Sequence, residues 1–251
     1  MPKVALQLYS IKEIGEKDFY HSLQVAKQAG YEGVEFAGFF GKEAEETKKY
    51  LEDLDLLPAG THIGLDALMD KFDDIMEYNA KIENSYVVVP FIPERFHSLD
   101  GLKTVAHYFN EMSEKAKQYG IKIGYHNHAY DFKQIEDHGY FYDIFASNTT
   151  SDIVLEIDTF WVVRGGADPV LYSQKYKDRL DLMHFKDISK DMVDTEVGSG
   201  LIDFPAILNA SDKIKWCVME QEKYTTLPML ESIAVSCEYI KKIIKDMNDR
   251  T

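Results

Sequence analysis

The sequence predicts an α/β protein that folds as a closed (β/α)8 barrel. Its length of 251 residues suits this class, whose members reach roughly 200–250 residues as a single domain. Short apolar segments rich in Val, Ile, Tyr and Phe alternate with longer amphipathic segments, a pattern typical of parallel strands joined by helices. The first apolar segment is not followed by the G-x-G-x-x-G loop of many doubly wound sheets. We therefore expect one barrel domain over residues 1–251.

Eight segments have the composition and length of buried parallel strands, and eight is the number that closes a barrel of this class. Each is followed by chain that can cross back to the start of the next strand. The predicted strands are Val4–Tyr9, Gly33–Ala37, Ala59–Gly64, Tyr86–Pro90, Lys122–Asn127, Ile153–Asp158, Leu180–Phe185 and Lys215–Glu220.

Several intervening segments carry a helical pattern. In residues 18–29 the apolar side chains recur at spacings of three and four, and Gly30 follows as a C-terminal stop. Two further helices are predicted over Leu102–Tyr119 and Pro228–Met247. The Glu- and Lys-rich residues 42–53 indicate another helix with a solvated face.

The charge balance argues against some partners. The chain has 43 acidic and 28 basic residues and a formal net charge of −15, whereas nucleic acids and anionic membranes attract clustered Lys and Arg. No apolar run approaches the roughly 18 residues of a membrane span, and the N-terminal segment lacks the pattern of a secretory signal. Cys217 and Cys237 are expected to be buried, reduced and free of metal. We expect a soluble cytoplasmic protein that binds neither nucleic acid nor membranes.

Titratable and polar side chains are concentrated at the C-terminal ends of the predicted strands, where barrels of this class carry their active sites. Taken singly, such residues have structural explanations: His62 as a hydrogen-bonded residue, or Glu35 as a member of an ion pair. Taken together, several charges buried at one barrel mouth are costly unless they pair or hold a cation. The residues are Gln7, Glu35, His62, Glu94, His126, His128, Asp158, His184 and Glu220.

Three of these residues indicate a metal site. Asp158, His184 and Glu220 end three consecutive predicted strands, so their side chains should point toward one place. Carboxylates combined with imidazole suit Mn²⁺, Co²⁺, Zn²⁺ or Fe²⁺, whereas an all-oxygen set would indicate Mg²⁺ or Ca²⁺. Structural zinc sites are usually closed and rich in Cys. An open catalytic site is therefore the better interpretation.

Motifs along the whole chain carry a resemblance to a known family. In order, they are LQLYS, GVEFAG, THIGLDAL, GYHNHAYDF, LEIDTFW, MHFKDI, EVGSGLIDF and VMEQE. Together they resemble the sugar phosphate isomerase/epimerase family of the xylose isomerase-like TIM barrels. The YHNH motif is similar to the branch near the inosose dehydratases and the 3-ketoglycoside lyases.

The resemblance implies one divalent ion, which would be Mn, Co, Zn or Mg. The family's epimerases have a glutamate at the position of His126, and they use two glutamates as an acid/base pair on opposite faces of the substrate. Because His126 departs from that pattern, Glu156 and His128 are alternative fourth ligands. The ligands that the resemblance implies are His126, Asp158, His184 and Glu220.

The resemblance also implies a reaction that begins by removing a proton α to a carbonyl, through a metal-bound enediolate. Glu220 would be the general base, or His126 if it does not bind the ion, and Lys186 would be a further catalytic group. Gly198 and Gly200 would either let the loop after the seventh strand close over the site or form an ordinary turn.

A wider set of residues is expected to contact the substrate. Trp161 would stack on a sugar face or pack within its loop, and Arg164 would bind a phosphate or carboxylate. The expected substrate-binding residues are Gln7, Glu35, His62, Glu94, His128, Glu156, Trp161 and Arg164.

The leading hypothesis is a divalent-metal-dependent isomerase or epimerase acting on a ketose or keto-sugar. A dehydratase or lyase, acting by β-elimination on an inosose or 3-ketoglycoside, is the first alternative. The others are an AP endonuclease of the endonuclease IV type, which the acidic charge disfavours, a two-metal xylose isomerase, and a non-catalytic sugar-binding barrel. The expected partner is a small-molecule sugar or polyol, with a second copy of the chain forming a homodimer.

Overall fold

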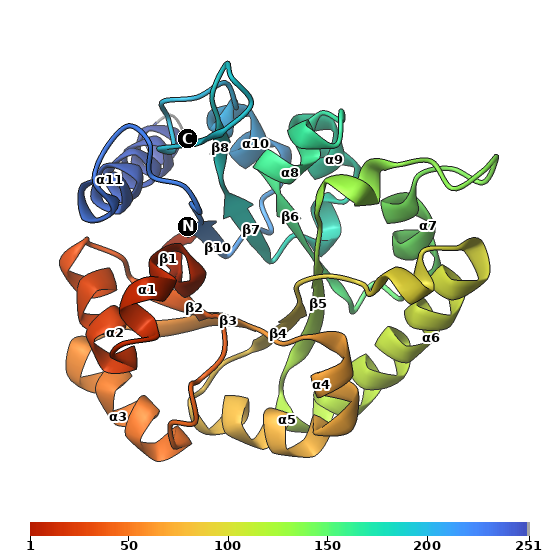
Figure 1. Cartoon of the computed structure of the whole chain (residues 1–251), viewed down its shortest axis with the longest axis horizontal. Coiled ribbons are helices and arrows are strands. Elements are labelled where there is room, and N and C mark those ends of the chain that lie inside the picture. Colours follow the sequence, from red (N-terminus) through yellow and green to blue (C-terminus); the bar gives the residue numbers. More distant parts are fainter. Residues whose placement is uncertain (250–251) are drawn as a thin grey trace.

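Eight parallel strands close into a barrel, with helices around its outside, in the computed structural model, which describes residues 1–249 (Figure 1). The strand order around the barrel is β1-β10-β7-β6-β5-β4-β3-β2. The predicted (β/α)8 fold is therefore confirmed. The strands are β1 (Lys3–Gln7), β2 (Gly33–Phe36), β3 (Leu57–His62), β4 (Tyr86–Val89), β5 (Lys122–His126), β6 (Val154–Asp158), β7 (Leu182–Phe185) and β10 (Trp216–Met219).

Every predicted strand overlaps an observed one, and the bounds differ by a few residues. The first strand ends at Gln7 because the next residues form a 3-10 helix, Leu8–Ile11, whose first turn is capped by the Gln7 side chain. A single domain over residues 1–251 stays a prediction, and Arg250 and Thr251 lie outside the described residues.

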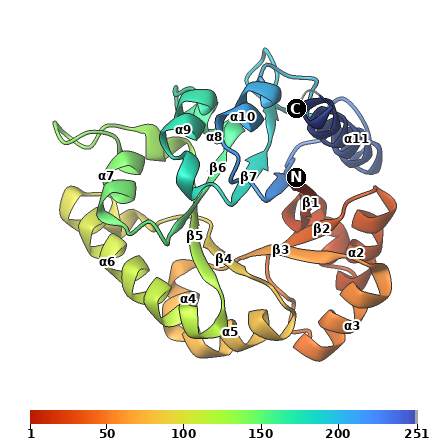
Figure 2. The same ribbon diagram turned by 180° about the vertical axis from the view of Figure 1, so that it is seen from behind.

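The helices lie outside the barrel, as the reverse view in Figure 2 also shows. The helix predicted over residues 18–29 corresponds to α2, which begins after Asp18, whose side chain accepts a hydrogen bond from the His21 amide. Leu102–Tyr119 corresponds to α6 and a short 3-10 helix after it. The helices are α1 (Lys12–Gly15), α2 (Phe19–Gln28), α3 (Ala44–Leu54), α4 (Leu65–Asp70), α5 (Phe72–Lys81), α6 (Leu99–Ala116), α7 (Phe141–Asn148), α8 (Thr159–Arg164), α9 (Pro169–Lys175), α10 (Phe204–Ala210) and α11 (Met229–Asn248).

A small antiparallel hairpin, not expected from the sequence, follows β7 and consists of β8 (Asp187–Ile188) and β9 (Asp194–Thr195). The Asp187 carboxylate accepts hydrogen bonds from four backbone amides of this region, including those of Gly198 and Gly200. A Cβ on Gly200 would collide with that carboxylate, and Gly198 has a φ of +91° and lies against the Tyr239 ring. The two glycines therefore permit close packing of this loop.

The barrel interior changes from apolar to polar along its axis. An apolar cluster, separate from the main core, joins side chains from strands that are not neighbours, so it lies inside the barrel. Side chains two residues apart on a strand point to the same side. Four of these apolar residues are therefore followed, toward the C-terminal end, by polar residues that also face inward. The pairs are Ala5 and Gln7, Val154 and Glu156, Leu182 and His184, and Val218 and Glu220.

Two further expectations from the sequence concern the cysteines and the helices. Cys217 and Cys237 are both free and buried. None of the helices in the part of the chain that the structure describes is long and apolar enough to cross a membrane.

Candidate active site

Four side chains meet at the C-terminal end of the barrel, and we call them the ligand cluster: His126, Asp158, His184 and Glu220. Each offers one ligand atom, and these atoms all lie within 4.8 Å of one another. His126 Nε2 lies 3.5 Å from Asp158 Oδ2, and His184 Nδ1 lies 3.7 Å from the same oxygen and 3.1 Å from Glu220 Oε2. Ligands about 2.1 Å from an ion in a tetrahedral site are about 3.4 Å apart. The spacing therefore suits a bound cation.

The hydrogen bonds around the ligand cluster also fit a metal. His126 Nε2 and Asp158 Oδ2 are buried and have no hydrogen-bond partner, which costs about 1–3 kcal/mol for each such group unless an ion or water satisfies it. The opposite atoms of both side chains are engaged. His126 Nδ1 lies 3.3 Å from the carbonyl oxygen of Pro90, and Asp158 Oδ1 accepts a 2.8 Å hydrogen bond from the Trp161 amide at the start of α8. The two free atoms are thus held toward the same point.

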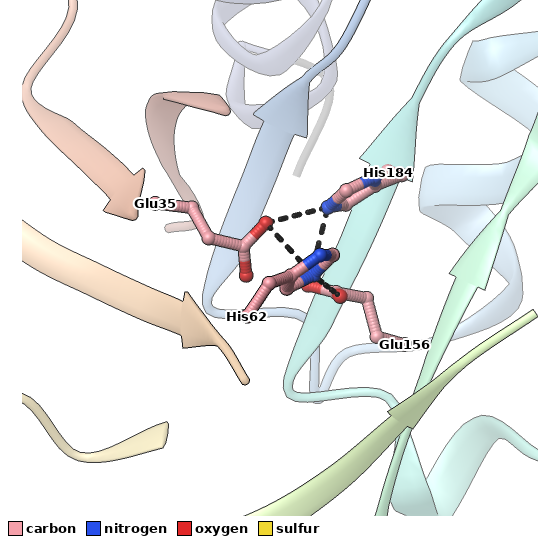
Figure 3. Close-up of side chains that lie close together, drawn as sticks. All are labelled: Glu35, His62, Glu156 and His184. Atoms are coloured by element: carbon pink, nitrogen blue, oxygen red, sulfur yellow. Dashed lines mark hydrogen bonds and ion pairs between the residues drawn. The ribbon is translucent and has the colours of Figure 1, made fainter. Parts of the chain in front are cut away.

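Beneath the ligand cluster lies a second group, which we call the inner network: Glu35, His62, Glu156 and the shared His184. Figure 3 shows these side chains pointing toward one another from β2, β3, β6 and β7. His184 Nε2 lies 2.6 Å from Glu35 Oε2, and His62 Nε2 lies 2.8 Å from Glu156 Oε2 and 3.3 Å from Glu35 Oε2. The distances of 2.6 and 2.8 Å are those of direct hydrogen bonds.

The two carboxyl groups of the inner network differ in their affinity for protons. Burial, together with the charge of Glu156, raises the pKa of Glu35. Burial also opposes ionisation of Glu156, but the His184 and His62 imidazoles outweigh it and lower the Glu156 pKa to about 2. Burial lowers the pKa of His62, but the charges of Glu35 and Glu156 raise it overall. Glu156 is therefore the more acidic of the two carboxyl groups.

Lys186 lies behind the ligand cluster and is fully buried. Its Nζ is 3.4 Å from Glu220 Oε2 and also contacts the Glu222 carboxylate. Burial would raise the pKa of Glu220, but the Lys186 ammonium and His184 hold it well below its ordinary value. Glu220 is therefore ionised.

A pocket of about 360 Å³ opens above the ligand cluster, a size within the range that holds small molecules. Burial and the neighbouring His126 lower the pKa of His128 to about 3, so His128 faces this pocket as a neutral imidazole. The pocket is lined by Tyr9, Ala37, His62, Pro90, Phe91, His126, His128, Trp161, Glu220 and Glu222.

A comparison of the sequence with known protein families identifies the family of this chain. A family model described as the xylose isomerase-like TIM barrel matches residues 23–243. The chain belongs to this family.

Relatives in the xylose isomerase-like family have more than one activity. An inosose dehydratase of Clostridium beijerinckii is 23% identical over 279 residues, which cover 94% of this chain and 91% of that protein. The crystal structure of a sugar phosphate isomerase/epimerase from Parabacteroides distasonis is 28% identical, with a TM-score of 0.81 and coverage of 96% of this chain and 94% of that one. The IOLI protein, whose crystal structure holds a zinc atom, shares the fold at 17% identity, with a TM-score of 0.77 and coverage of 97% and 98%.

Within this xylose isomerase-like barrel, some predicted site residues lie away from the pocket. Gln7, Glu35 and Glu156 are fully buried, and Lys186 lies behind the carboxylates, so none of the four lines the pocket. Substrate contacts of these four residues stay a prediction. His62, His128 and Trp161, in contrast, line the pocket as predicted substrate contacts should.

Glu94 and Arg164 are exposed and also lie outside the pocket lining. Glu94 starts a 3-10 helix after β4 and lines a neighbouring pocket that shares Phe91 and His128 with this one. Arg164 is the last residue of α8, and its guanidinium donates to the backbone carbonyl of Met192 at 2.9 Å. Substrate contacts of these two residues stay a prediction.

Glu222 is a pocket residue that the sequence reasoning missed. It lines the pocket, contacts Lys186, and its backbone amide donates a 2.7 Å hydrogen bond to Asp194 Oδ2. The signal available for it was its position two residues after Glu220, in the segment that leaves β10 at the C-terminal end of the barrel.

Proposed function

We propose that this protein is a divalent-metal-dependent enzyme that removes a proton from the carbon next to the carbonyl of a keto-sugar or keto-polyol. The observation that carries the proposal is the pair of unpartnered buried atoms, His126 Nε2 and Asp158 Oδ2, which face His184 and Glu220 beneath a pocket. Relatives that act as inosose dehydratases and as sugar isomerases or epimerases support this class of chemistry.

The donor set indicates which ions would suit the ligand cluster. Two imidazoles and two carboxylates favour Mn²⁺, Co²⁺, Zn²⁺ or Fe²⁺ over Mg²⁺, which prefers an all-oxygen shell. When bound, such an ion would polarise the substrate carbonyl and lower the pKa of the neighbouring C–H.

Glu220 is the residue that we assign as the general base. It lines the pocket and stays ionised because Lys186 and His184 stabilise its charge. Lys186 acts through Glu220, since its own ammonium is buried behind the two carboxylates. The neutral His128 and the ring of Trp161 form the wall that would bind substrate hydroxyls and a sugar face.

The placement of the carboxylates favours isomerisation or β-elimination over epimerisation. Epimerisation by two bases needs a second proton-transfer group on the opposite face of the substrate. Of the described residues that line the pocket, the carboxylates are Glu220 and Glu222, and both follow β10. Because His126 occupies the position of the epimerases' other glutamate, proton removal and the following step would take place from one side.

A single set of measurements tests the proposal. Metal content is determined for the purified protein, and solvent deuterium incorporation is followed for a panel of ketoses, inososes and 3-keto-glucosides. We expect the wild-type protein to exchange the α-hydrogen of one of these compounds. The Glu220→Gln variant should not catalyse this exchange, and neither should the metal-free protein. Product analysis then separates isomerisation from loss of a β-substituent.

The same panel distinguishes the rival functions. Binding of a sugar without any exchange of hydrogen would favour a non-catalytic barrel and would sink the proposal. Cleavage of DNA at abasic sites would favour an endonuclease, against which the net charge of −15 argues.

A further inference from the structure

His184 is placed between two carboxylates that contact different nitrogens of its ring. Its Nε2 lies 2.6 Å from Glu35 Oε2, on the side of the inner network. Its Nδ1 lies 3.1 Å from Glu220 Oε2, on the side of the ligand cluster. The imidazole is fully buried, so water does not compete for either nitrogen.

The contact with Glu35 determines which nitrogen is available to a metal. A neutral imidazole has one N–H and one lone pair. When Nε2 carries the hydrogen and donates it to Glu35, the lone pair lies on Nδ1 and points at the ligand cluster. A carboxylate in this position orients a metal-binding histidine and increases its basicity.

The surroundings of Glu35 are adapted to hold its carboxylate in this place. Gln7 Nε2 donates a 2.7 Å hydrogen bond to Glu35 Oε2, and Gln7 Oε1 accepts one of 3.0 Å from the Tyr9 amide, so the orientation of the amide group is defined. A Cβ on Gly60 would lie 2.6 Å from Glu35 Oε1. A side chain at residue 60 would therefore force the carboxylate to shift from its present position.

The inner network is also a possible metal site by its residue types, but its geometry argues against one. His62 Nε2 lies 3.3 Å from Glu35 Oε2 and His184 Nε2 lies 3.5 Å from Glu156 Oε1, close to the about 3.4 Å between ligands of one ion. The other two distances, 2.6 Å from His184 to Glu35 and 2.8 Å from His62 to Glu156, are hydrogen-bond lengths. An ion would have to break both of these hydrogen bonds. An ion in the inner network would also have to bind His184 through Nε2, the nitrogen that carries the hydrogen donated to Glu35.

We propose that Glu35, oriented by Gln7 and accommodated by Gly60, is a positioning residue that presents His184 Nδ1 to the metal, and that the inner network binds no ion of its own. This inference rests on the proposed function, because it takes the ligand cluster as the metal site. It assigns to a carboxylate on β2 a role toward a ligand on β7, across the barrel.

The test is a titration of the metal-free protein with Co²⁺, followed by calorimetry and by the visible absorption of the bound ion. Wild-type protein should bind one Co²⁺ per chain. Glu35→Gln should bind it about 10- to 100-fold more weakly, as loss of an outer-shell partner does, and with an altered absorption spectrum. Thermal unfolding of each variant reports whether the fold is retained.

Glu156→Gln is the matched control, since Glu156 is equally buried in the inner network, but its hydrogen bond goes to His62 and its Oε1 lies 3.5 Å from His184 Nε2, against 2.6 Å for Glu35 Oε2. It should weaken Co²⁺ binding several-fold less than Glu35→Gln does. If Glu35→Gln does not fold, Gly60→Ala and Gln7→Met test the same displacement of the carboxylate and should weaken binding in the same direction.

The outcomes separate this inference from the proposed function. Two ions per chain, or a Glu35→Gln protein with the affinity and spectrum of the wild type, would overturn the positioning role while leaving a metal enzyme. Wild-type protein that binds no divalent ion would overturn the proposed function itself.

Discussion

The ligand cluster and the inner network have the same composition, two imidazoles and two carboxylates, and they share His184. They differ in the distances between these groups. In the inner network each imidazole has a carboxylate oxygen within 2.8 Å, whereas the shortest such distance in the ligand cluster is 3.1 Å. Each group contains two buried atoms without a hydrogen-bond partner, Glu35 Oε1 and Glu156 Oε1 in one, His126 Nε2 and Asp158 Oδ2 in the other. Neither residue types nor unsatisfied atoms alone therefore identify a metal site. The distances between the imidazoles and the carboxylates distinguish the two groups.

The largest effect is expected from Asp158→Asn, which alters the ligand cluster alone. The amide keeps an oxygen that can accept the Trp161 hydrogen bond at the start of α8, but it replaces the free oxygen with a nitrogen that cannot bind a cation. Metal affinity should fall by more than about 100-fold, beyond the effect of an outer-shell change. Proton exchange should be lost with it.

Metal analysis after dialysis and a thermal unfolding curve check this expectation. A folded Asp158→Asn protein that keeps its full metal content would show that the ion binds at another site. Binding by the inner network would then become the better interpretation.

Lys186→Met should mainly affect stability. Removing one member of a buried ion pair typically costs about 3–5 kcal/mol, and Lys186 is fully buried against Glu220. Denaturant unfolding should show this loss, and added Mn²⁺ should restore part of it, because the cation compensates Glu220. As a control, Lys117→Met removes an exposed lysine that pairs with Glu114 and Asp152, and it should reduce the stability far less, because water screens exposed ion pairs. A Lys186→Met protein as stable as this control contradicts the expectation.

A smaller effect is expected from pH, and it acts through the shared residue. Burial lowers the pKa of His184, but the charges of Glu156 and Glu35 outweigh burial and raise it well above its ordinary value. Without metal, both ring nitrogens are therefore protonated at neutral pH, and an ion must displace the proton on Nδ1. Apparent affinity should then fall about tenfold for each unit by which the pH is lowered.

Calorimetry in buffers with different ionisation enthalpies measures the proton released on binding. Glu35→Gln provides the comparison, because the lost charge lowers the His184 pKa and should reduce the pH dependence. An affinity that does not change with pH would mean that His184 is already neutral.

Much of the ligand cluster was predictable, because residues that end neighbouring parallel strands must meet at one barrel mouth. Asp158, His184 and Glu220 were found in this way. The same reasoning says less about Glu94 and Arg164, because Glu94 begins a 3-10 helix and Arg164 ends α8, and the alternation of side chains along a strand does not extend to either. The β8–β9 hairpin was missed because strands of two residues leave no periodic signal.

The sequence by itself determined the barrel, the strands and the inward-facing side of each strand, because the alternation of side chains is a local property of extended chain. Only the tertiary structure decided how the inward-facing residues divide into two groups. Glu35 and His184 are 149 residues apart in the chain, and their contact depends on the closure and radius of the barrel. That contact sets which nitrogen of His184 faces the pocket side, a choice for which the sequence holds no local signal.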